Sequence, residues 1–195
     1  MYVRDLGSVN RFLQCLNVYM YKRLASLDAS RNMSLLEWCR WLQDTPIGAG
    51  IRESAFTYPL LEGSHVMGLA LSVGTVMWFD LRLLGLTMRR DSVTNVFDQV
   101  RPWMSVGFVI MFVTGALLFA SRAVDAYEST YFRIKLGLLM LGAVNVVLFH
   151  TTVDRQRDAW DTATTPPPRA RLAGALSLVL WFGIIAAGRI MAYNL

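Results

Sequence analysis

The sequence predicts an all-α integral membrane protein, a four-helix bundle with short interfacial helices near its N-terminus. Of its 195 residues 54% are hydrophobic and only 17% are charged, whereas about a quarter of a soluble domain is charged. The apolar residues gather in four runs, each matching the roughly 20 helical residues that cross the hydrocarbon core of a bilayer. The runs are continuously apolar and do not alternate, which argues against a transmembrane barrel. The predicted spans are residues 57–82, 103–121, 134–153 and 172–193, within one domain from 33 to 195.

Residues 1–32 differ from the rest of the chain. They are mixed in composition and hold no apolar run long enough for a span or for the core of a signal peptide. Met33 then opens the segment MSLLEWCRWLQDTP, which would make a natural start. Two interpretations stay open: residues 1–32 precede the true start of the protein, or they form a cytoplasmic or surface extension.

Two short helices are predicted before the first span. Residues 34–43 are amphipathic, and their two tryptophans suit the headgroup layer of a membrane. The apolar face would carry Leu35, Trp38, Cys39 and Leu42. Thr45 followed by Pro46 is typical of an N-cap and the first position of a second helix.

Basic residues in the loops predict the orientation of the spans. Loops 83–102 and 154–171 share one side, and the triple proline in the second loop predicts an extended connector. That side carries Arg82, Arg89, Arg90, Arg101, Arg155, Arg157, Arg169 and Arg171. The other side carries Arg40, Arg52, Arg122, Arg133, Lys135 and Arg189, and residues 1–32 would add five more charges there. The spans themselves favour a non-cytoplasmic position for both termini.

The net charge of +5 does not indicate a nucleic-acid-binding protein. The basic side chains flank the spans, and no nucleic-acid-binding motif accompanies them. The expected surroundings are therefore a lipid bilayer. Cys15 and Cys39 have no metal-binding spacing, and their spacing leaves open whether they pair or stay free thiols.

Ionisable residues inside the spans form two predicted polar layers. His65 and Asp80 are fifteen residues apart, which places them on one helix face at roughly 22 Å along the axis. Lys135 and His150 repeat this spacing on the third span, which runs parallel to the first. The outer layer would comprise Glu62, His65, Lys135 and Arg189, and the inner layer would comprise Asp80, Arg82, Arg101 and His150.

Haem binding is the first functional hypothesis for these layers. Histidines in membrane bundles are suitable axial ligands for haem b, so His65 and His150 are candidate ligands. Lys135 and Arg189 are candidate partners for the propionates. The two histidines fall at opposite ends of the bundle, so a single haem cannot use both. The protein would then be a small redox-associated membrane subunit.

Two other hypotheses stay open. The layers could gate a proton-linked transporter of small solutes, with His65 and His150 as titrating groups. The bundle could also be an accessory subunit without activity that binds a membrane or periplasmic partner. A structural role, such as an Asp80–His150 or Asp80–Arg82 ion pair, is favoured for Arg82 and Arg101. No nucleophile elbow, phosphate loop or cysteine metal cluster points to an enzyme class, and no catalytic residue is assigned.

Several segments resemble one known family. They are RESAFTYPLLEGSHVMGLALSVGTVMWFDLRLLGL, RPWMSVGFVIMFVTGALLF, YFRIKLGLLMLGAVNVVLFH and GRIMAYNL. The chain is similar over residues 33–195 to a bacterial family of small four-span inner-membrane proteins, catalogued as a domain of unknown function. The matching residues are Glu62, His65, Asp80, Arg82, Leu84, Gly85, Pro102, Trp103, Arg133, Lys135, Asn145, His150 and Arg189. The resemblance implies a start at Met33 and a bacterial inner-membrane location, but no activity.

Overall fold

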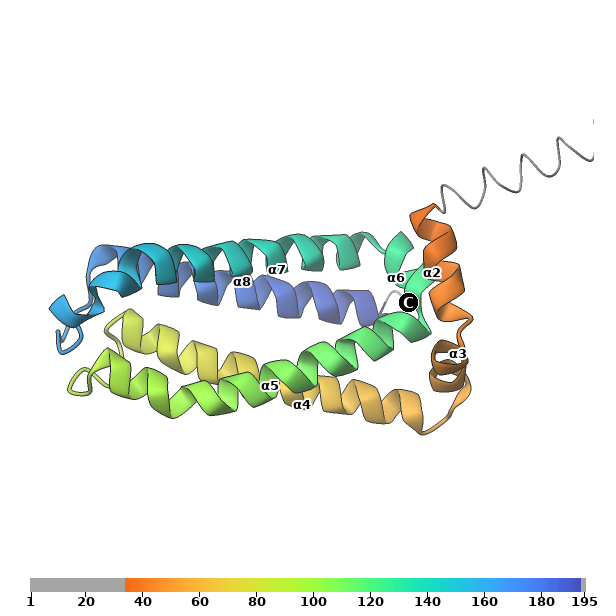
Figure 1. The fold of residues 1–195 in the computed structure, drawn as a ribbon, viewed down its shortest axis with the longest axis horizontal. Coiled ribbons are helices and arrows are strands. Elements are labelled where there is room, and N and C mark those ends of the chain that lie inside the picture. Colours follow the sequence, from red (N-terminus) through yellow and green to blue (C-terminus); the bar gives the residue numbers. More distant parts are fainter. Residues whose placement is uncertain (1–33, 194–195) are drawn as a thin grey trace, which may run out of the picture.

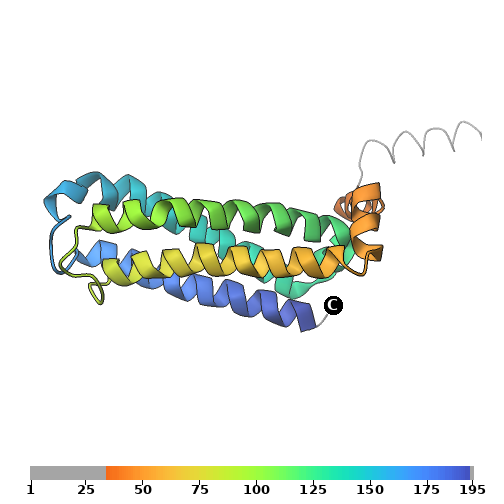
Figure 2. The same ribbon diagram turned by 90° about the horizontal axis from the view of Figure 1, so that it is seen from below.

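The computed structural model describes residues 34–193, apart from the side chains of residues 156 and 157, and this part of the chain contains helices and no strands. Four long helices run lengthwise side by side (Figures 1 and 2), and all are long and apolar enough to cross a membrane. They are α4 (Thr57–Leu83), α5 (Val93–Ser121), α7 (Thr130–Leu148) and α8 (Pro168–Tyr193). A short π-helix, η1 (Phe149–Val153), continues α7. The predicted all-α membrane class is confirmed.

Two short helices precede α4, as the sequence predicts. The first, α2 (Leu35–Gln43), begins with a capping box, because the Ser34 hydroxyl accepts a hydrogen bond from the Glu37 amide and the Glu37 carboxylate accepts one from the Ser34 amide. The second, α3 (Pro46–Glu53), is capped by Thr45. Both lie across the end of the bundle that also holds the end of α8 (Figure 1).

The short helices are attached to this end of the bundle by specific contacts. The Gln43 side chain of α2 accepts a hydrogen bond of 3.0 Å from the Val124 amide in α6 (Ala123–Glu128). Cys39 is buried, whereas Trp41 stays exposed. Cys15 and the whole of residues 1–32 lie outside the described residues, so the pairing of the cysteines and the nature of the extension remain predictions.

Three helices begin earlier than predicted, because each starts with a polar first turn that hydropathy alone places in a loop. The α5 helix begins at Val93 and not at 103, where Ser92 caps it and Val93, Val96 and Val100 enter the core. The α7 helix begins at Thr130. The α8 helix begins at Pro168, so the last of the three prolines occupies the first helical position, where its missing N–H is harmless.

The long helices form two hairpins, α4 with α5 and α7 with α8, which lie one above the other in Figure 1. Small residues bring α4 and α5 close together: a Cβ added at Gly107 would lie 2.5 Å from the Ser72 amide nitrogen. The hairpins meet where α4 contacts α8. There a Cβ on Gly174 would lie 3.1 Å from the carbonyl oxygen of Asp80.

The two remaining long helices, α5 and α7, are held further apart. No Cα of α5 lies within 8 Å of a Cα of α7. Aromatic rings bridge the wider space, with Phe119 stacked on Phe132 at 5.5 Å near one end and Phe97 edge-on to His150 at 6.5 Å near the other. The helices therefore contact in the order α5, α4, α8, α7, and the fourth side of the bundle is closed only by large side chains.

Candidate functional site

The best-defined polar contact inside the spans joins His65 on α4 to Thr114 on α5. The His65 Nδ1 and Thr114 Oγ1 atoms are 3.0 Å apart. The Thr114 hydroxyl uses its single proton on the Ile110 carbonyl at 2.6 Å, so its oxygen accepts from His65 Nδ1–H. This assigns the tautomer with the proton on Nδ1. The Met111 backbone also bonds to the ring, and no described side chain bonds to Nε2.

Lys135 lies close to this histidine. The two side chains are near enough for an electrostatic interaction, although they come from different hairpins. The Lys135 ammonium lies over α8, where a Cβ on Gly188 would be 3.8 Å from Nζ. No described carboxylate pairs with it. A half-buried ammonium group inside a span without a described counter-ion is energetically unfavourable.

The other two residues of the predicted outer layer do not join His65 and Lys135. Glu62 is exposed and forms no ion pair with a described residue. Arg189 turns along its own helix, where it donates to the Tyr193 hydroxyl at 3.2 Å and lies over the Tyr193 ring. Of the predicted outer layer, only His65 and Lys135 interact, and together with Thr114 they make up what we call the outer cluster.

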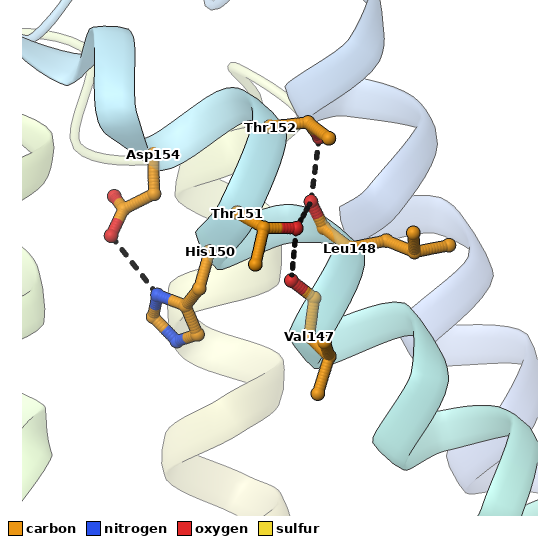
Figure 3. A network of polar contacts seen from close by, with 6 residues as sticks. All are labelled: Val147, Leu148, His150, Thr151, Thr152 and Asp154. Carbon is orange, nitrogen blue, oxygen red and sulfur yellow. Dashed lines mark hydrogen bonds and ion pairs between the residues drawn. The ribbon is translucent and has the colours of Figure 1, made fainter.

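The predicted inner layer does not form a cluster, and His150 shows this most clearly. Its Nδ1 atom lies 3.0 Å from Asp154 Oδ2, within its own chain segment (Figure 3). The His150 side chain is 46% exposed. Its ring contacts are edge-on with Phe97 and Phe149, so His150 lies at the same end of the bundle as Asp80 without pairing with it.

The π-helix η1 explains part of the difference between the expected and the observed direction of the His150 side chain. The expected face of His150 assumes 100° per residue throughout, but His150 is the second residue of η1. A π-turn bonds i to i+5 and changes the direction of the side chains that follow. In addition, no Cα of α7 lies within 8 Å of a Cα of α4, so equal depth does not bring Asp80 and His150 face to face.

Asp80 is the most deeply buried carboxyl group inside the spans, with 4% of its surface exposed. The Ser177 hydroxyl of α8 lies within hydrogen-bonding reach of it. Its Oδ2 atom has no hydrogen-bond partner among the described residues. Neither of the expected ion pairs, with His150 or with Arg82, is formed.

Arg82 has a structural role at the loop end of the bundle. It is fully buried, and its guanidinium donates to the carbonyl of Asp91 at 2.9 Å and to that of Ala163 at 3.1 Å. It therefore ties the loop after α4 to the loop before α8. Arg101 is exposed and bonds to none of the described residues, so it does not complete the inner layer.

Sequence reasoning missed Thr114 and Ser177. Each is a hydroxyl residue in an apolar run, and such residues commonly bond to their own helix, as Thr114 does to Ile110. Only the packing of a second helix shows which hydroxyls also meet an ionisable side chain. Asn145, one of the residues that carry the family resemblance, donates to the Ala173 carbonyl at 3.1 Å and joins α7 to α8.

The described residues do not form a metal site with several protein ligands. No group of three or more His, Cys, Asp or Glu side chains gathers among residues 34–193. A single imidazole nitrogen beside a cation is what the outer cluster offers.

Comparisons with known proteins place the chain in a family. No curated protein and no solved structure matches the chain. A family model described as a family of unknown function matches residues 49–194, which include all four long helices. Because this match covers most of the chain, the protein belongs to that family of unknown function, DUF6644.

Proposed function

We propose that this protein is a small haem-binding subunit of a bacterial inner membrane, with His65 as the axial ligand. The observation that carries the proposal is the His65–Thr114 hydrogen bond, 3.0 Å long, which holds the ring by Nδ1 while no described side chain bonds to Nε2. Histidines that ligate metals usually donate their other ring N–H to a fixed acceptor, which sets the tautomer and the orientation. Bound haem would supply one-electron chemistry.

Lys135 supports the same site from the second hairpin. Haem b carries two carboxylate propionates, and the ammonium of Lys135 lies in electrostatic range of His65 without a carboxylate partner in the described chain. Arg189 is a weaker candidate for this role, because Tyr193 already engages its guanidinium.

The test is an absorption spectrum of the purified protein from cells with ample haem, first oxidised and then reduced with dithionite. We expect a sharp reduced α band in the wild type. His65→Ala should abolish the band, since it removes the ligand. His150→Ala is the matched control and should keep it, because His150 is exposed and paired with Asp154.

Two results would overturn the proposal: a colourless wild-type protein, or a band that His65→Ala leaves intact. Lys135→Met gives a further check, since loss of the propionate partner should speed the transfer of haem to apomyoglobin. Circular dichroism of each variant separates loss of haem from loss of fold. If the protein is a redox subunit, a membrane or periplasmic partner must exchange electrons with it.

A further inference from the structure

We infer that Asp80 is a proton-binding site, a carboxylic acid that holds an exchangeable proton at neutral pH within the α4–α8 contact. The first observation is its burial, since only 4% of the residue is exposed. The second is the orphaned Oδ2 atom, which has no partner among the described residues. An isolated carboxylate in such surroundings is strongly disfavoured, whereas the neutral acid loses far less.

No neighbouring cation offers an alternative way to stabilise the charge. The titratable groups at this end of the elements around Asp80 are Asp98 and Arg101 on α5, His150 on η1, Asp154 at the start of the 3₁₀-helix η2 (Asp154–Ala159), and Arg169 and Arg171 on α8. None of them forms an ion pair with Asp80, and no described charged side chain acts on its carboxyl group. Arg82, two residues further along α4, donates from Nε and Nη2 to the loop carbonyls, and its Nη1 has no partner among the described residues and forms no ion pair with Asp80.

The α8 helix packs closely on α4 at the position of Asp80. Gly174 packs directly on the α4 backbone, where a Cβ would lie 3.1 Å from the carbonyl oxygen of Asp80 and 3.2 Å from the Leu83 Cβ. One helical turn further along α8, Ser177 presents its hydroxyl to the carboxyl group.

The charge state of Asp80 matters because this residue lies in the contact between the two hairpins. The α4–α8 contact is where the long helices of the two hairpins meet in the described part of the chain. Loss of the proton would place an uncompensated charge in this contact. Proton uptake and release at Asp80 would thus be coupled to the stability of the α4–α8 contact between the two hairpins.

Infrared spectroscopy of the whole protein in lipid tests this inference, and the result does not depend on haem binding. Exposed carboxyl groups are ionised at pH 7, so the carbonyl-stretching band of a protonated carboxyl group at that pH reports a perturbed site. We expect this band in the wild type, with a shift to lower wavenumber in D₂O. Asp80→Asn should remove it, and Asp98→Asn, which alters an exposed carboxylate, should keep it.

Ser177→Ala identifies the band even if Asp80→Asn fails to fold. Loss of the hydroxyl donor should move the band to higher wavenumber, an effect that a merely structural change at this position would not produce. Absence of the band from the wild type at pH 7 would overturn the inference. So would a band that persists in Asp80→Asn, that does not shift in D₂O, or that Ser177→Ala leaves unmoved.

Discussion

Gly107 and Ser72 show how single residues set the approach of α4 to α5. A Cβ at Gly107 would lie 2.5 Å from the Ser72 amide nitrogen and 2.9 Å from its Cα and Cβ. These are mostly backbone atoms, which cannot move aside as the end of a flexible side chain can. In lipid, where apolar burial does not drive helix association, such close contact of small residues is a main source of stability.

We therefore expect Gly107→Ala to destabilise the bundle by about 1–3 kcal/mol, the usual range for overpacking. The measurement is the thermal unfolding midpoint in detergent. Gly74→Ala is the matched control, because nothing lies within 4 Å of a Cβ at that position. Gly74→Ala should leave the midpoint unchanged or raise it, since alanine favours a helix. Equal effects of the two changes would contradict the close packing described above.

At the scale of elements, Arg82 connects two loops that lie far apart in the sequence. Its guanidinium binds the carbonyls of Asp91 and Ala163, and it is fully buried. Gly85 adds to the same junction, because its φ of +71° is unfavourable for other residues and a Cβ there would lie 3.4 Å from the Thr164 carbonyl oxygen. Arg82 and the turn at Gly85 therefore hold the loop end of the bundle together with the bonds from the Val93 and Thr94 amides to Asp161.

Replacing Arg82 tests this connection. Arg82→Met should lower the free energy of unfolding by about 2–4 kcal/mol, since hydrogen bonds from a charged group contribute more than neutral ones. The freed loop should also be cleaved faster by trypsin after Arg89 and Arg90. Arg101→Met, which changes an exposed arginine without a described partner, should alter neither property. If Arg82→Met has the wild-type free energy of unfolding and the wild-type rate of trypsin cleavage, the connection between the two loops is dispensable.

For the whole molecule, an even number of long helices places both ends of the described chain at the same end of the bundle, as Figure 1 shows. We propose that this end faces the periplasm, because the opposite loops carry more arginine than this end of the bundle does. The cluster of His65, Thr114 and Lys135 would then lie near the periplasmic surface.

Cysteine labelling of intact spheroplasts checks this orientation. In a background without Cys15 and Cys39, Glu128→Cys should react with a membrane-impermeant maleimide. Thr164→Cys, in the loop at the other end, should react only after the membrane is permeabilised. Glu128 and Thr164 are both exposed, so the protein itself shields neither position from the maleimide. The reverse pattern would place the arginine-rich loops outside.

Features that depend on neighbouring residues in the sequence were predictable. The four spans follow from the length of each apolar run, and the starts of α2 and α3 follow from Ser34, Thr45 and Pro46, whose capping contacts reach only three residues along the chain. The helix starts at Val93, Thr130 and Pro168 were predicted too late, because a polar first turn outside the hydrocarbon has no hydropathy signal.

The candidate site was predictable only in part, for a physical reason. Helical spacing placed His65 and Lys135 at one depth, and the structure brings them close. Spacing along a helix gives depth and direction, but it does not say which helices touch. The pairing of His65 with Thr114 and of Asp80 with Ser177 depends on how α4 lies against α5 and α8.

The sequence by itself determined that this chain is a helical membrane protein, since the hydrophobic length of a span is a local property. The tertiary structure alone decided which polar groups meet. It separated His150 from Asp80 through a π-turn and through the spacing of α4 and α7, which have no Cα atoms within 8 Å of each other. It also buried Asp80 without an ionic partner, because close contacts at small residues such as Gly174 set the helix neighbours, and these contacts join segments distant in sequence.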